Sequence, residues 1–481
     1  MEYKHALFLN PYTSSNSSRD MVRELFPPTG LEYVATSAKD FVDKLTLIDL
    51  RYEKDLSNTD RLLDFISKEI DIVCVAIGWD RQFKEICSFL NLIPNNIPLV
   101  VGGYKATEMV EELFETCPKI DIIVRGEGEE TIKKILQKMP LENILGISYR
   151  KGDRIIHNAN RPLQNVDIIT PPDRTLRRAK YSMKLHGVNV LNLTFDTILS
   201  ARGCPYNCKF CTFDLNPLGQ KRRYSERSAE SVVKEIEGIA ADAILFSDDN
   251  FFTNIRRSEK ICDLIIERNI KKRFIAQARI EIAQYPKLLK KMVKAGFKLL
   301  LIGIESPHDR ILAQLDKGFN SDTVRKSFEI LMKYPIYYHG YFIYGNIGET
   351  EEEMLYISKF AKEIGVDTIT YSKLRIEKFS PLRQIVEKTP GYYMENGGTL
   401  YSDKYDQAAL KRIGKKIKFS FYTPFKILKI AVKFLKVKFF TFGEIIYSAV
   451  ACPLLLKNVI AREVRKGRLS DSLKRIFINN A

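Results

Sequence analysis

The segment that decides the fold is Arg202 to Phe213, which reads RGCPYNCKFCTF. It places three cysteines, Cys204, Cys208 and Cys211, close together in a chain that has only eight. Thiolate sites for zinc or for an iron–sulfur cluster usually use four ligands. The segment directly follows a strand-like apolar run at 190–200, so we expect the cysteines in a loop after a strand. Either a fourth ligand lies elsewhere, or one metal position is left open.

The spacing C-x3-C-x2-C favours an iron–sulfur cluster over zinc and over three incidental cysteines. A zinc site needs a fourth Cys or His nearby, and the closest histidine is His186, eighteen residues before Cys204. Three thiolates on one short loop can instead hold three irons of a four-iron cluster. The fourth iron can then chelate a small molecule, as a catalytic zinc keeps an open position. The other cysteines are scattered and indicate buried thiols in a reducing cytosol, not a disulfide framework: Cys74, Cys87, Cys117, Cys262 and Cys452.

The first 135 residues have the pattern of a parallel sheet in a chain whose 481 residues call for two or three domains. Near-continuous apolar runs, separated by amphipathic helical segments, predict strands covered on both faces. Small or polar loops follow the strands, and a ligand at this edge is favoured over mere tight turns, because ligands bind at the carboxyl ends of such strands. The predicted strands are 4–9, 45–50, 71–77, 97–101 and 120–124.

The alternation of strands and helices resumes from about residue 190 to 390. Between the two regions, 136–190 reads as a connector, with a small hairpin around Lys151–Asp153 and a break at Pro171–Pro172. Six strand–helix units fit a partial or full α/β barrel, whose chemistry lies at the carboxyl ends of its strands. The predicted strands are 190–200, 243–247, 273–277, 299–303, 338–344 and 366–371, with helices between them at 225–240, 256–268, 285–295 and 322–334, among others.

The cysteine segment resembles a known family. CPYNCKFC, with Phe210 before the third cysteine, is similar to the signature of the radical S-adenosylmethionine (SAM) superfamily. The resemblance implies a 4Fe-4S cluster on Cys204, Cys208 and Cys211 whose open iron binds the amino and carboxylate groups of SAM. The reduced cluster then cleaves SAM to a 5′-deoxyadenosyl radical. The protein holds cofactor and substrate and excludes water and oxygen.

Four later strands resemble the subgroup of this superfamily that carries an N-terminal cobalamin-binding domain. They are ILFSDDNFF (244–252), FIAQAR (274–279), LLIGIES (300–306) and GYFIYG (340–345). The resemblance places Asp248 and Asp249 near the amino group of SAM, Arg279 opposite its carboxylate and Glu305 at its ribose, and each pairing is chemically reasonable. Helix capping and structural ion pairs are the alternatives. The implied SAM-binding set is Phe210, Asp248, Asp249, Arg279, Glu305 and Gly345.

The N-terminal half is similar to the cobalamin domain of that subgroup. PLVVGGYKAT, IDIIVRGEGEET and the PPDR connector carry the likeness. The Asp-x-His-x-x-Gly motif, which supplies a lower axial histidine in many cobalamin proteins, is absent. A domain that binds cobalamin without histidine and a domain that has lost the cofactor therefore both remain open. The implied cobalamin-binding residues are Asn10, Thr13, Ser14, Gly78, Trp79, Gly102, Gly103, Gly126 and Glu127.

The predicted fold is α/β in four parts. Residues 1–140 form a cobalamin-binding-type, flavodoxin-like or Rossmann-like parallel sheet, and 141–188 form a linker. Residues 189–392 form a partial (β/α)6 TIM-type barrel with the radical SAM site. Residues 393–481 form a basic, mainly helical C-terminal region.

The resemblance implies an enzyme, and most directly a methyltransferase that acts on an unactivated carbon of a small or lipid-like substrate. The radical removes a hydrogen atom, methylcobalamin supplies the methyl group, and a second SAM remethylates the cobalamin. An external one-electron reductant of the flavodoxin or ferredoxin type is implied as a partner. Radical cyclisation or rearrangement, as in the anaerobic Mg-protoporphyrin cyclase of chlorophyll synthesis, is not separated from methyl transfer by the sequence. The catalytic groups that contact the substrate are unknown.

Two other functions are disfavoured. Methylthio-transfer to tRNA needs a second cluster on three N-terminal cysteines, but Cys74 lies within a predicted buried strand, and Cys87 and Cys117 lie in helical surroundings. A simple electron carrier would close its cluster with a fourth cysteine and would not need a six-unit barrel with charged groups at its strand ends.

The positive charge of the chain is concentrated at its C-terminal end. Net charge is +17 overall, whereas residues 401–481 hold 18 Lys and Arg against 5 Asp and Glu. Residues 411–440 carry ten basic and no acidic side chains, interleaved with seven aromatic ones. Such a segment suits a membrane surface, but helices packed on the barrel with their lysines in water explain it equally well. Nucleic acid is a weaker third reading.

No signal peptide or membrane-spanning segment is predicted. The first residues lack the basic flank and apolar run of a leader. The longest apolar stretch, Ile445 to Leu456, has twelve residues with Pro453 inside, short of the ~18 that a spanning helix needs. We expect a cytoplasmic protein, with peripheral contact at the inner membrane surface if 411–440 binds lipid.

Overall fold

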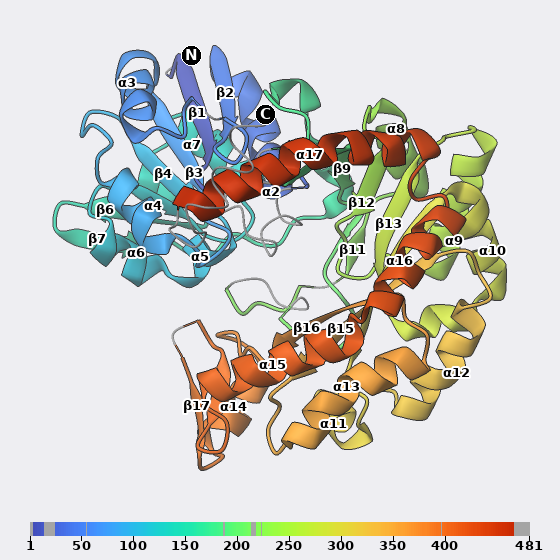
Figure 1. The fold of residues 1–481 in the computed structure, drawn as a ribbon. Coiled ribbons are helices and arrows are strands. Elements are labelled where there is room, and N and C mark those ends of the chain that lie inside the picture. Colours follow the sequence, from blue (N-terminus) through green and yellow to red (C-terminus); the bar gives the residue numbers. More distant parts are fainter. Residues whose placement is uncertain are drawn as a thin grey trace.

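Two seven-stranded sheets and a set of C-terminal helices make up the protein (Figure 1). The predicted α/β class is confirmed. The computed structural model describes residues 3–13, 25–53, 55–185, 188–212, 218–222, 224–395 and 397–465.

The first sheet has the strand order β2-β1-β3-β4-β5-β6-β7. Strands β1 to β5 run parallel in the 2-1-3-4-5 order of flavodoxin-like folds. The predicted hairpin around 151–153 is present, and it continues this sheet through antiparallel pairing of β6 with β5. The strands are β1 His5–Asn10, β2 Lys44–Asp49, β3 Ile72–Ala76, β4 Leu99–Gly102, β5 Ile122–Val124, β6 Ile147–Lys151 and β7 Arg154–His157.

Helices cover both faces of the first sheet, which explains why its strands are apolar throughout. Successive residues of a strand point to opposite faces. Leu7 and Leu9 accordingly belong to the core beneath α3, α4 and α6, whereas Ala6 and Phe8 belong to the core beneath α2 and α7. The helices are α2 Thr29–Ala38, α3 Thr59–Glu69, α4 Phe83–Leu90, α5 Tyr104–Glu108, α6 Val110–Thr116 and α7 Glu129–Leu136.

The second sheet is a partial barrel with the order β16-β15-β14-β13-β12-β9-β8. Its six strands from β9 to β16 are parallel, and β8 joins them antiparallel to β9. Strands β8 and β16 form the two edges and do not pair, so the barrel is open. The strands are β8 Ser182–Leu185, β9 Val188–Ile198, β12 Ala243–Phe246, β13 Arg273–Ala278, β14 Phe297–Glu305, β15 Tyr337–Tyr344 and β16 Thr368–Lys373.

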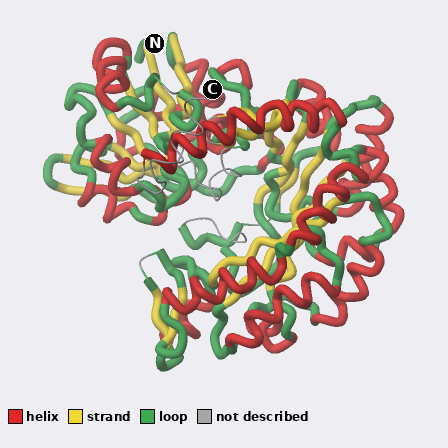
Figure 2. The backbone as a smooth tube through the Cα atoms, in the orientation of Figure 1, coloured by secondary structure: helices red, strands yellow, loops and turns green. Residues whose placement is uncertain are grey.

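A layer of helices covers the outer face of this sheet, and Figure 2 shows the strands inside and the helices outside. The core between the layers is rich in aromatic rings: Phe246 stacks on Phe297 at 5.7 Å between centroids, and Phe274 packs beside both. The helices are α8 Ala229–Gly238, α9 Ile255–Glu267, α10 Pro286–Ala295, α11 Asp309–Gln314, α12 Ser321–Leu331 and α13 Glu351–Glu363. Two small ribbons complete the barrel region: β10 Ala201–Arg202 with β11 Ser225–Glu226, and β17 Tyr392–Met394 with β18 Leu400–Ser402.

The C-terminal region starts with the β17–β18 ribbon, and the rest of its described part is mainly helical. Helix α14 Leu382–Glu387 precedes it, and its three long helices are α15 Gln407–Phe421, α16 Pro424–Lys436 and α17 Phe442–Arg465. The buried side of α15 joins the core beside α13 and β16. The end of α16 reaches the inner face of the barrel sheet, where Phe434 stacks on Tyr337 at 4.0 Å. Helix α17 lies along β9, and the Ser448 hydroxyl donates to the Val190 carbonyl at 2.7 Å. None of the described helices is long and apolar enough to cross a membrane.

The connector ties the two sheets together through buried charges. Arg177 donates to both carboxylate oxygens of Glu32 on α2, at 2.6 and 2.7 Å, and to Asp196 on β9. Arg174 donates to the same Asp196 at 2.9 Å and to Glu235 on α8 at 2.8 Å. Burial opposes ionisation of Asp196, but the two guanidinium groups hold its pKa below the usual value. These charges therefore fix how the first sheet sits against the barrel.

Candidate functional site

The three cysteines lie on the loop after β9 and β10, at the carboxyl end of the barrel sheet. Cys204, Cys208 and Cys211 are partly exposed, and none forms a disulfide. The backbone N–H of Cys211 donates to the carbonyl of Cys208 at 3.0 Å, which makes a tight turn between them. The N–H of Lys209 donates to the Leu315 carbonyl at 3.0 Å, so the loop is anchored to the end of α11.

The donor set of this loop fits an iron–sulfur cluster. Arg279 Nη1 lies 3.5 Å from the Cys208 sulfur, so a guanidinium cation stands beside the place where thiolate-bound metal would carry negative charge. Burial raises the pKa of the Cys204 thiol. Within the described residues, no three His, Cys, Asp or Glu side chains gather around one point as a single metal ion would require. Three thiols that each bind a different iron are not subject to that requirement.

Asp248 and Asp249, which follow β12, both contact the cysteine loop. Asp248 is 1% exposed, and its carboxylate accepts from the backbone N–H groups of Ser200 and Ala201 at 2.6 and 3.0 Å, and from the Ser200 hydroxyl. Asp249 accepts from the N–H of Gly203 at 3.2 Å. Burial and the charge of Asp248 raise the pKa of Asp249 to about 7. Asp248 therefore supports the loop from beneath, and Asp249 is the member of the pair with a single anchoring contact.

Arg279 and Glu305 lie on the next two strand ends. Arg279 follows β13, stacks over the Tyr206 ring at 3.8 Å and pairs with Glu281 at 2.7 Å. Glu305 ends β14 and pairs with buried Lys317 at 3.2 Å. Its φ is +71°, a left-handed conformation that costs ~1–3 kcal/mol for a non-glycine residue and is often found at functional sites. Arg279 also donates to the Lys317 carbonyl, so one chain of contacts links both groups to the cysteine loop.

Phe210 and Gly345 lie at the margin of this group. Phe210 packs against the small apolar core around Ile343 and Leu382, and Lys317 Nζ lies 5.6 Å from its ring centre. Gly345 follows β15 with φ +75°, and a Cβ there would lie 3.1 Å from Leu410 of α15. Arg279 thus contacts Cys208 directly, and Asp249 contacts the backbone of Gly203, next to Cys204. Glu305 is linked to Arg279 through Lys317, whereas Gly345 lies against Leu410 of α15.

The predicted edge of the first sheet is built mainly by backbone. Gly103 has φ +107°, and a Cβ there would lie 2.8 Å from the Ile77 carbonyl, so only glycine fits. The N–H of Gly126 donates to Thr107 Oγ1 at 3.0 Å. Gly102 approaches Val124, with 3.5 Å between an added Cβ and the Val124 Cβ. Among the described residues, no atom lies within 4 Å of a Cβ added at Gly78.

The other residues predicted at this edge differ in burial and in the hydrogen bonds that they already make. Asn10 is buried, and its amide donates to Asp49 at 2.9 Å. The N–H and hydroxyl of Thr13 bond Gln82 at 3.1 and 3.0 Å. Trp79 is 53% exposed, and its backbone N–H and carbonyl both bond the Tyr12 hydroxyl at 2.8 Å. Ser14 lies outside the described residues.

The carboxyl edges of the two sheets meet directly. The hydroxyls of Tyr104, after β4, and Thr212, beside the third cysteine, are 3.1 Å apart. Arg202, two residues before Cys204, pairs with Glu127 at 3.1 Å and with Glu129. Glu127 is therefore engaged by the barrel instead of being free, and it also pairs with Arg222. Any ligand at the edge of the first sheet would lie beside the cysteine loop.

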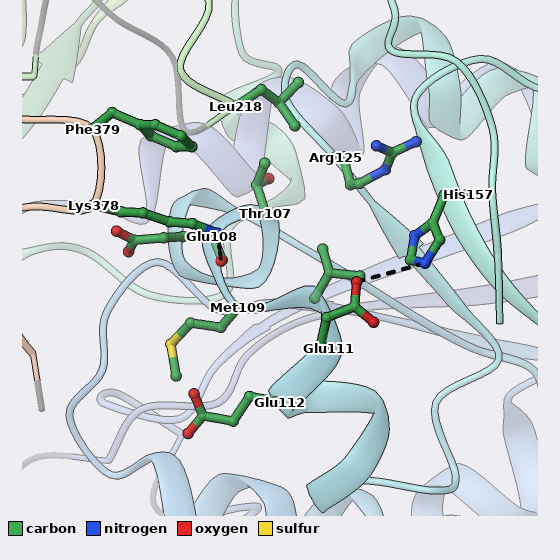
Figure 3. A pocket seen from close by; sticks show the side chains of 11 residues that line it. Thr107, Glu108, Met109, Glu111, Glu112, Arg125, His157, Leu218, Lys378 and Phe379 are labelled. Atoms are coloured by element: carbon green, nitrogen blue, oxygen red, sulfur yellow. Dashed lines mark hydrogen bonds and ion pairs between the residues drawn. The ribbon is translucent and has the colours of Figure 1, made fainter.

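A cavity of about 360 Å³ lies at this meeting point (Figure 3). Thr107 to Glu112 line it from the first sheet, and Lys378 and Phe379 line it from the barrel side. Leu218, which follows the cysteine segment, lies 3.4 Å from a Cβ added at Gly126. On its wall, His157 Nε2 lies 3.5 Å from Glu111 Oε1. The residues predicted to bind cobalamin are not among those that line this cavity, but Gly126 lies close to it, beside Leu218.

Sequence reasoning missed the charged residues that join the edges. Arg202 lies next to Gly203 in the cysteine segment, and its position could have suggested a role there. Nothing in the sequence pairs Glu129, Arg222 or Lys317 with their partners, because each pair spans a long sequence separation or depends on a loop conformation. The Tyr104–Thr212 contact likewise follows only from the packing of one domain on the other.

Comparison with protein-family models identifies both halves of the chain. Residues 198–361 match the radical SAM superfamily, and residues 20–136 match the B12 binding domain. The chain belongs to the radical SAM superfamily, in the group with an N-terminal B12-binding domain, and is a radical SAM enzyme. The resemblance drawn from the cysteine segment is confirmed.

Individual relatives are more distant. An uncharacterised methyltransferase of Pyrococcus horikoshii is 29% identical over 76% of this chain and 80% of its own length. The anaerobic magnesium-protoporphyrin IX monomethyl ester cyclase of Cereibacter sphaeroides is 27% identical over 61% of this chain, but only 49% of the cyclase is covered. The structure of the radical SAM methyltransferase TsrM from Kitasatospora setae, solved with tryptophan and a SAM analogue, superposes with TM-score 0.68. Identity to TsrM is 16%, over 88% of this chain and 89% of that one, so this likeness concerns the fold.

Proposed function

We propose that the protein is a cobalamin-dependent radical SAM methyltransferase that acts on an unactivated carbon of a small or lipid-like substrate. The observation that carries the proposal is the direct contact between the two carboxyl edges, at Tyr104–Thr212 and at Arg202 with Glu127 and Glu129. A cofactor on the first sheet and one on the cysteine loop would be neighbours. The name of the Pyrococcus relative supports methyl transfer.

The residues of the cysteine loop and of the barrel strand ends have defined tasks in this proposal. When bound, a four-iron cluster with SAM supplies a 5′-deoxyadenosyl radical, and cobalamin supplies a methyl carrier. Cys204, Cys208 and Cys211 would hold the cluster. Asp249 would accept from the amino group of SAM, and Arg279 would face its carboxylate. Asp248 fixes the start of the cysteine loop through three hydrogen bonds.

The net reaction gives the proposal a stoichiometry that can be measured. One C–H substrate, two SAM and two electrons give the methylated product, 5′-deoxyadenosine, methionine and S-adenosylhomocysteine. The C–H bond and two S–C bonds break, and the new C–C bond and the C–H bond of deoxyadenosine form. The electrons come from an external one-electron donor of the flavodoxin or ferredoxin type.

The test is anaerobic reconstitution of the full chain with iron and sulfide, followed by cobalamin, SAM, a reductant and candidate substrates. The proposal expects 5′-deoxyadenosine and S-adenosylhomocysteine in equal amounts, with the second product absent when cobalamin is left out. Bound iron without any retained cobalt, after cobalamin has been supplied, would refute the cobalamin part and leave the radical SAM assignment intact.

Radical cyclisation is the second candidate, because the Cereibacter cyclase is nearly as similar in sequence. The same assay separates the two functions. A cyclase reaction forms 5′-deoxyadenosine but does not need a methyl donor, so it leaves S-adenosylhomocysteine at background.

A further inference from the structure

The C-terminal helices carry an apolar face that the rest of the described chain does not cover. On α16, Phe425, Leu428, Val432 and Leu435 are 66%, 61%, 41% and 48% exposed. Their spacing of three, four and three residues puts them on one side of the helix. Four further side chains at intervals of four residues do the same on α17: Phe442, Ile446, Val450 and Leu454, which are 78%, 49%, 74% and 53% exposed.

These side chains are not the ones that hold the helices to the barrel. The opposite side of α16 makes the packing contacts, with Ile430 and Phe434 against the inner face of the sheet. Lys426 Nζ donates to the Val366 carbonyl at 2.6 Å, also on the packed side. Glu444 of α17 pairs with Arg273 at 2.9 Å. The helices are therefore fixed to the barrel on one side and present leucine, valine and phenylalanine to solvent on the other.

The aromatic residues of 411–440 divide between the two sides. Phe421 and Phe439 are buried, whereas Phe419 and Phe425 are 73% and 66% exposed. Much of the basic–aromatic pattern thus serves packing on the barrel. The exposed face of α16 is mainly aliphatic, with the exposed Lys429 and Lys436 beside it. One set of side chains in 411–440 therefore packs on the barrel, as one interpretation of the sequence expects, and a different set is exposed and available for surface contact, as the other expects.

We propose that this face, Phe425, Leu428, Val432 and Leu435 with the neighbouring stripe of α17, docks on the surface of an anionic lipid bilayer. A helix with an apolar face and lysines at its border lies in the interface plane, where its apolar side chains enter the acyl boundary. The lysines meet the negative lipid headgroups, each contributing to attraction near the surface. In Figure 1 both helices lie on the front side of the molecule.

Charge selects the bilayer over two other occupants. Residues 411–440 hold ten basic and no acidic side chains, so docking a second copy on this face would bring like charges together. Nucleic acid would satisfy the charge, but bases stack on aromatic rings, and six of the eight side chains of this face are aliphatic, with rings at Phe425 and Phe442 alone. A layer of anionic headgroups above acyl chains matches both the basic charge of the segment and its aliphatic face.

The surface is separate from the cysteine loop. The end of α16 packs near the starts of the strands, against Leu191, Ala243 and Tyr337, whereas the cysteines follow the carboxyl end of β9. Docking therefore goes beyond the proposed reaction and does not depend on it. Variants on the exposed face can be scored for lipid binding and for SAM cleavage independently.

The test is flotation of the anaerobically purified full chain with two kinds of vesicle, pure phosphatidylcholine and phosphatidylcholine with roughly one-third phosphatidylglycerol. The wild type is expected to float with the anionic vesicles only. The Leu428→Glu/Leu435→Glu variant is expected to lose at least about tenfold in the bound-to-free ratio. Lys429→Glu/Lys436→Glu should lose binding to a similar extent, and raised salt should weaken wild-type binding.

A matched control carries the same charge change at two exposed apolar positions elsewhere. Leu92 and Ile168 are 58% and 75% exposed, so Leu92→Glu/Ile168→Glu should bind vesicles like the wild type. Circular dichroism and 5′-deoxyadenosine formation should be the same for all four proteins. The proposal is overturned if Leu428→Glu/Leu435→Glu floats like the wild type, or if the wild type does not float. Light scattering that shows a dimer dispersed by that variant would assign the face to a second copy, and RNA binding without flotation would assign it to nucleic acid.

Discussion

The carboxyl edges of the two sheets are built on different principles. At the barrel edge, strand after strand ends in a charged side chain: Asp248, Asp249, Arg279 and Glu305. These groups contact the cysteine loop directly or through Lys317. At the edge of the first sheet glycines follow β3, β4 and β5, and β1 and β2 end in the buried, mutually bonded Asn10 and Asp49. The charged Glu127 and Glu129 nearby are engaged by Arg202 of the barrel.

The two edges differ in whether side chains or backbone shape do the binding. The barrel edge places side chains that can bind metal and charged groups, so single substitutions there should abolish or shift a reaction. The first edge provides shape, through backbone turns and open space at Gly78. Its substitutions should change cofactor affinity or stability without touching the radical step. The predictions below probe this contrast, starting with the largest expected effect.

Removing one cysteine of the loop should eliminate the reaction. Cys208→Ala leaves two thiolates, too few for the three irons, and takes away the sulfur beside Arg279. We expect anaerobically reconstituted iron to fall far below four per chain and 5′-deoxyadenosine to fall to background. Iron analysis and product chromatography measure both.

The matched control for that variant is Cys452→Ala, because Cys452 is the exposed cysteine on α17. It should keep full iron content and full activity. Unchanged deoxyadenosine formation in Cys208→Ala would mean that the barrel edge does not depend on its side chains as the comparison requires.

The connection between the edges should depend on Arg177. Arg177→Leu leaves the buried carboxylate of Glu32 without its partner and leaves Asp196 with Arg174 alone, and breaking a buried ion pair costs about 3–5 kcal/mol. We expect a loss of that size in the free energy of unfolding, measured by urea titration. Arg178→Leu removes a neighbouring, half-exposed pair with Glu53 and should cost ~0–1 kcal/mol. Equal losses in the two variants would show that the connector network is not what joins the sheets.

The two adjacent aspartates should separate loop support from SAM binding. Asp248→Ala leaves two buried N–H groups and a hydroxyl without their acceptor, so iron retention is expected to fall about 10–100-fold. Asp249→Asn should keep its iron but raise KM for SAM about tenfold or more, because a hydrogen bond to a charged group contributes ~1.5–3 kcal/mol. Iron loss in Asp249→Asn with normal iron in Asp248→Ala would reverse the two roles.

Sequence reasoning found the barrel edge because its chemistry lies in residue types at fixed spacings. The three cysteines are recognised by their spacing. The charged residues at the ends of β12, β13 and β14 are recognised because each follows a strand-like apolar run. The same reasoning located the glycine loops of the first edge. It could not show that Glu127 would pair with Arg202, or that the Asn10 amide would donate its hydrogen bond to Asp49.

What the sequence could not supply is tertiary packing between distant segments. Lys105 meets Glu377, and Asp80 meets Arg375, at 3.3 and 3.0 Å across the domain boundary. No local pattern encodes such pairs. The division of the C-terminal aromatic residues between packing and exposure is similar, because one helical repeat serves both faces and only the docked structure tells them apart.

The smallest effects are expected for the glycines. They test whether the first edge binds its ligand through the shape of the backbone. Gly103→Ala forces a Cβ to 2.8 Å from the Ile77 carbonyl at φ +107°, which should cost ~1–3 kcal/mol of stability. Gly78→Ala meets no atom within 4 Å and should change stability by less than ~0.5 kcal/mol. If cobalamin covers that edge, the added methyl group should still weaken its binding about tenfold, because overpacking costs ~1–3 kcal/mol. An absorbance titration of each variant with hydroxocobalamin measures this. Wild-type affinity in Gly78→Ala would place the cofactor away from Gly78, and the open space there would then need another occupant.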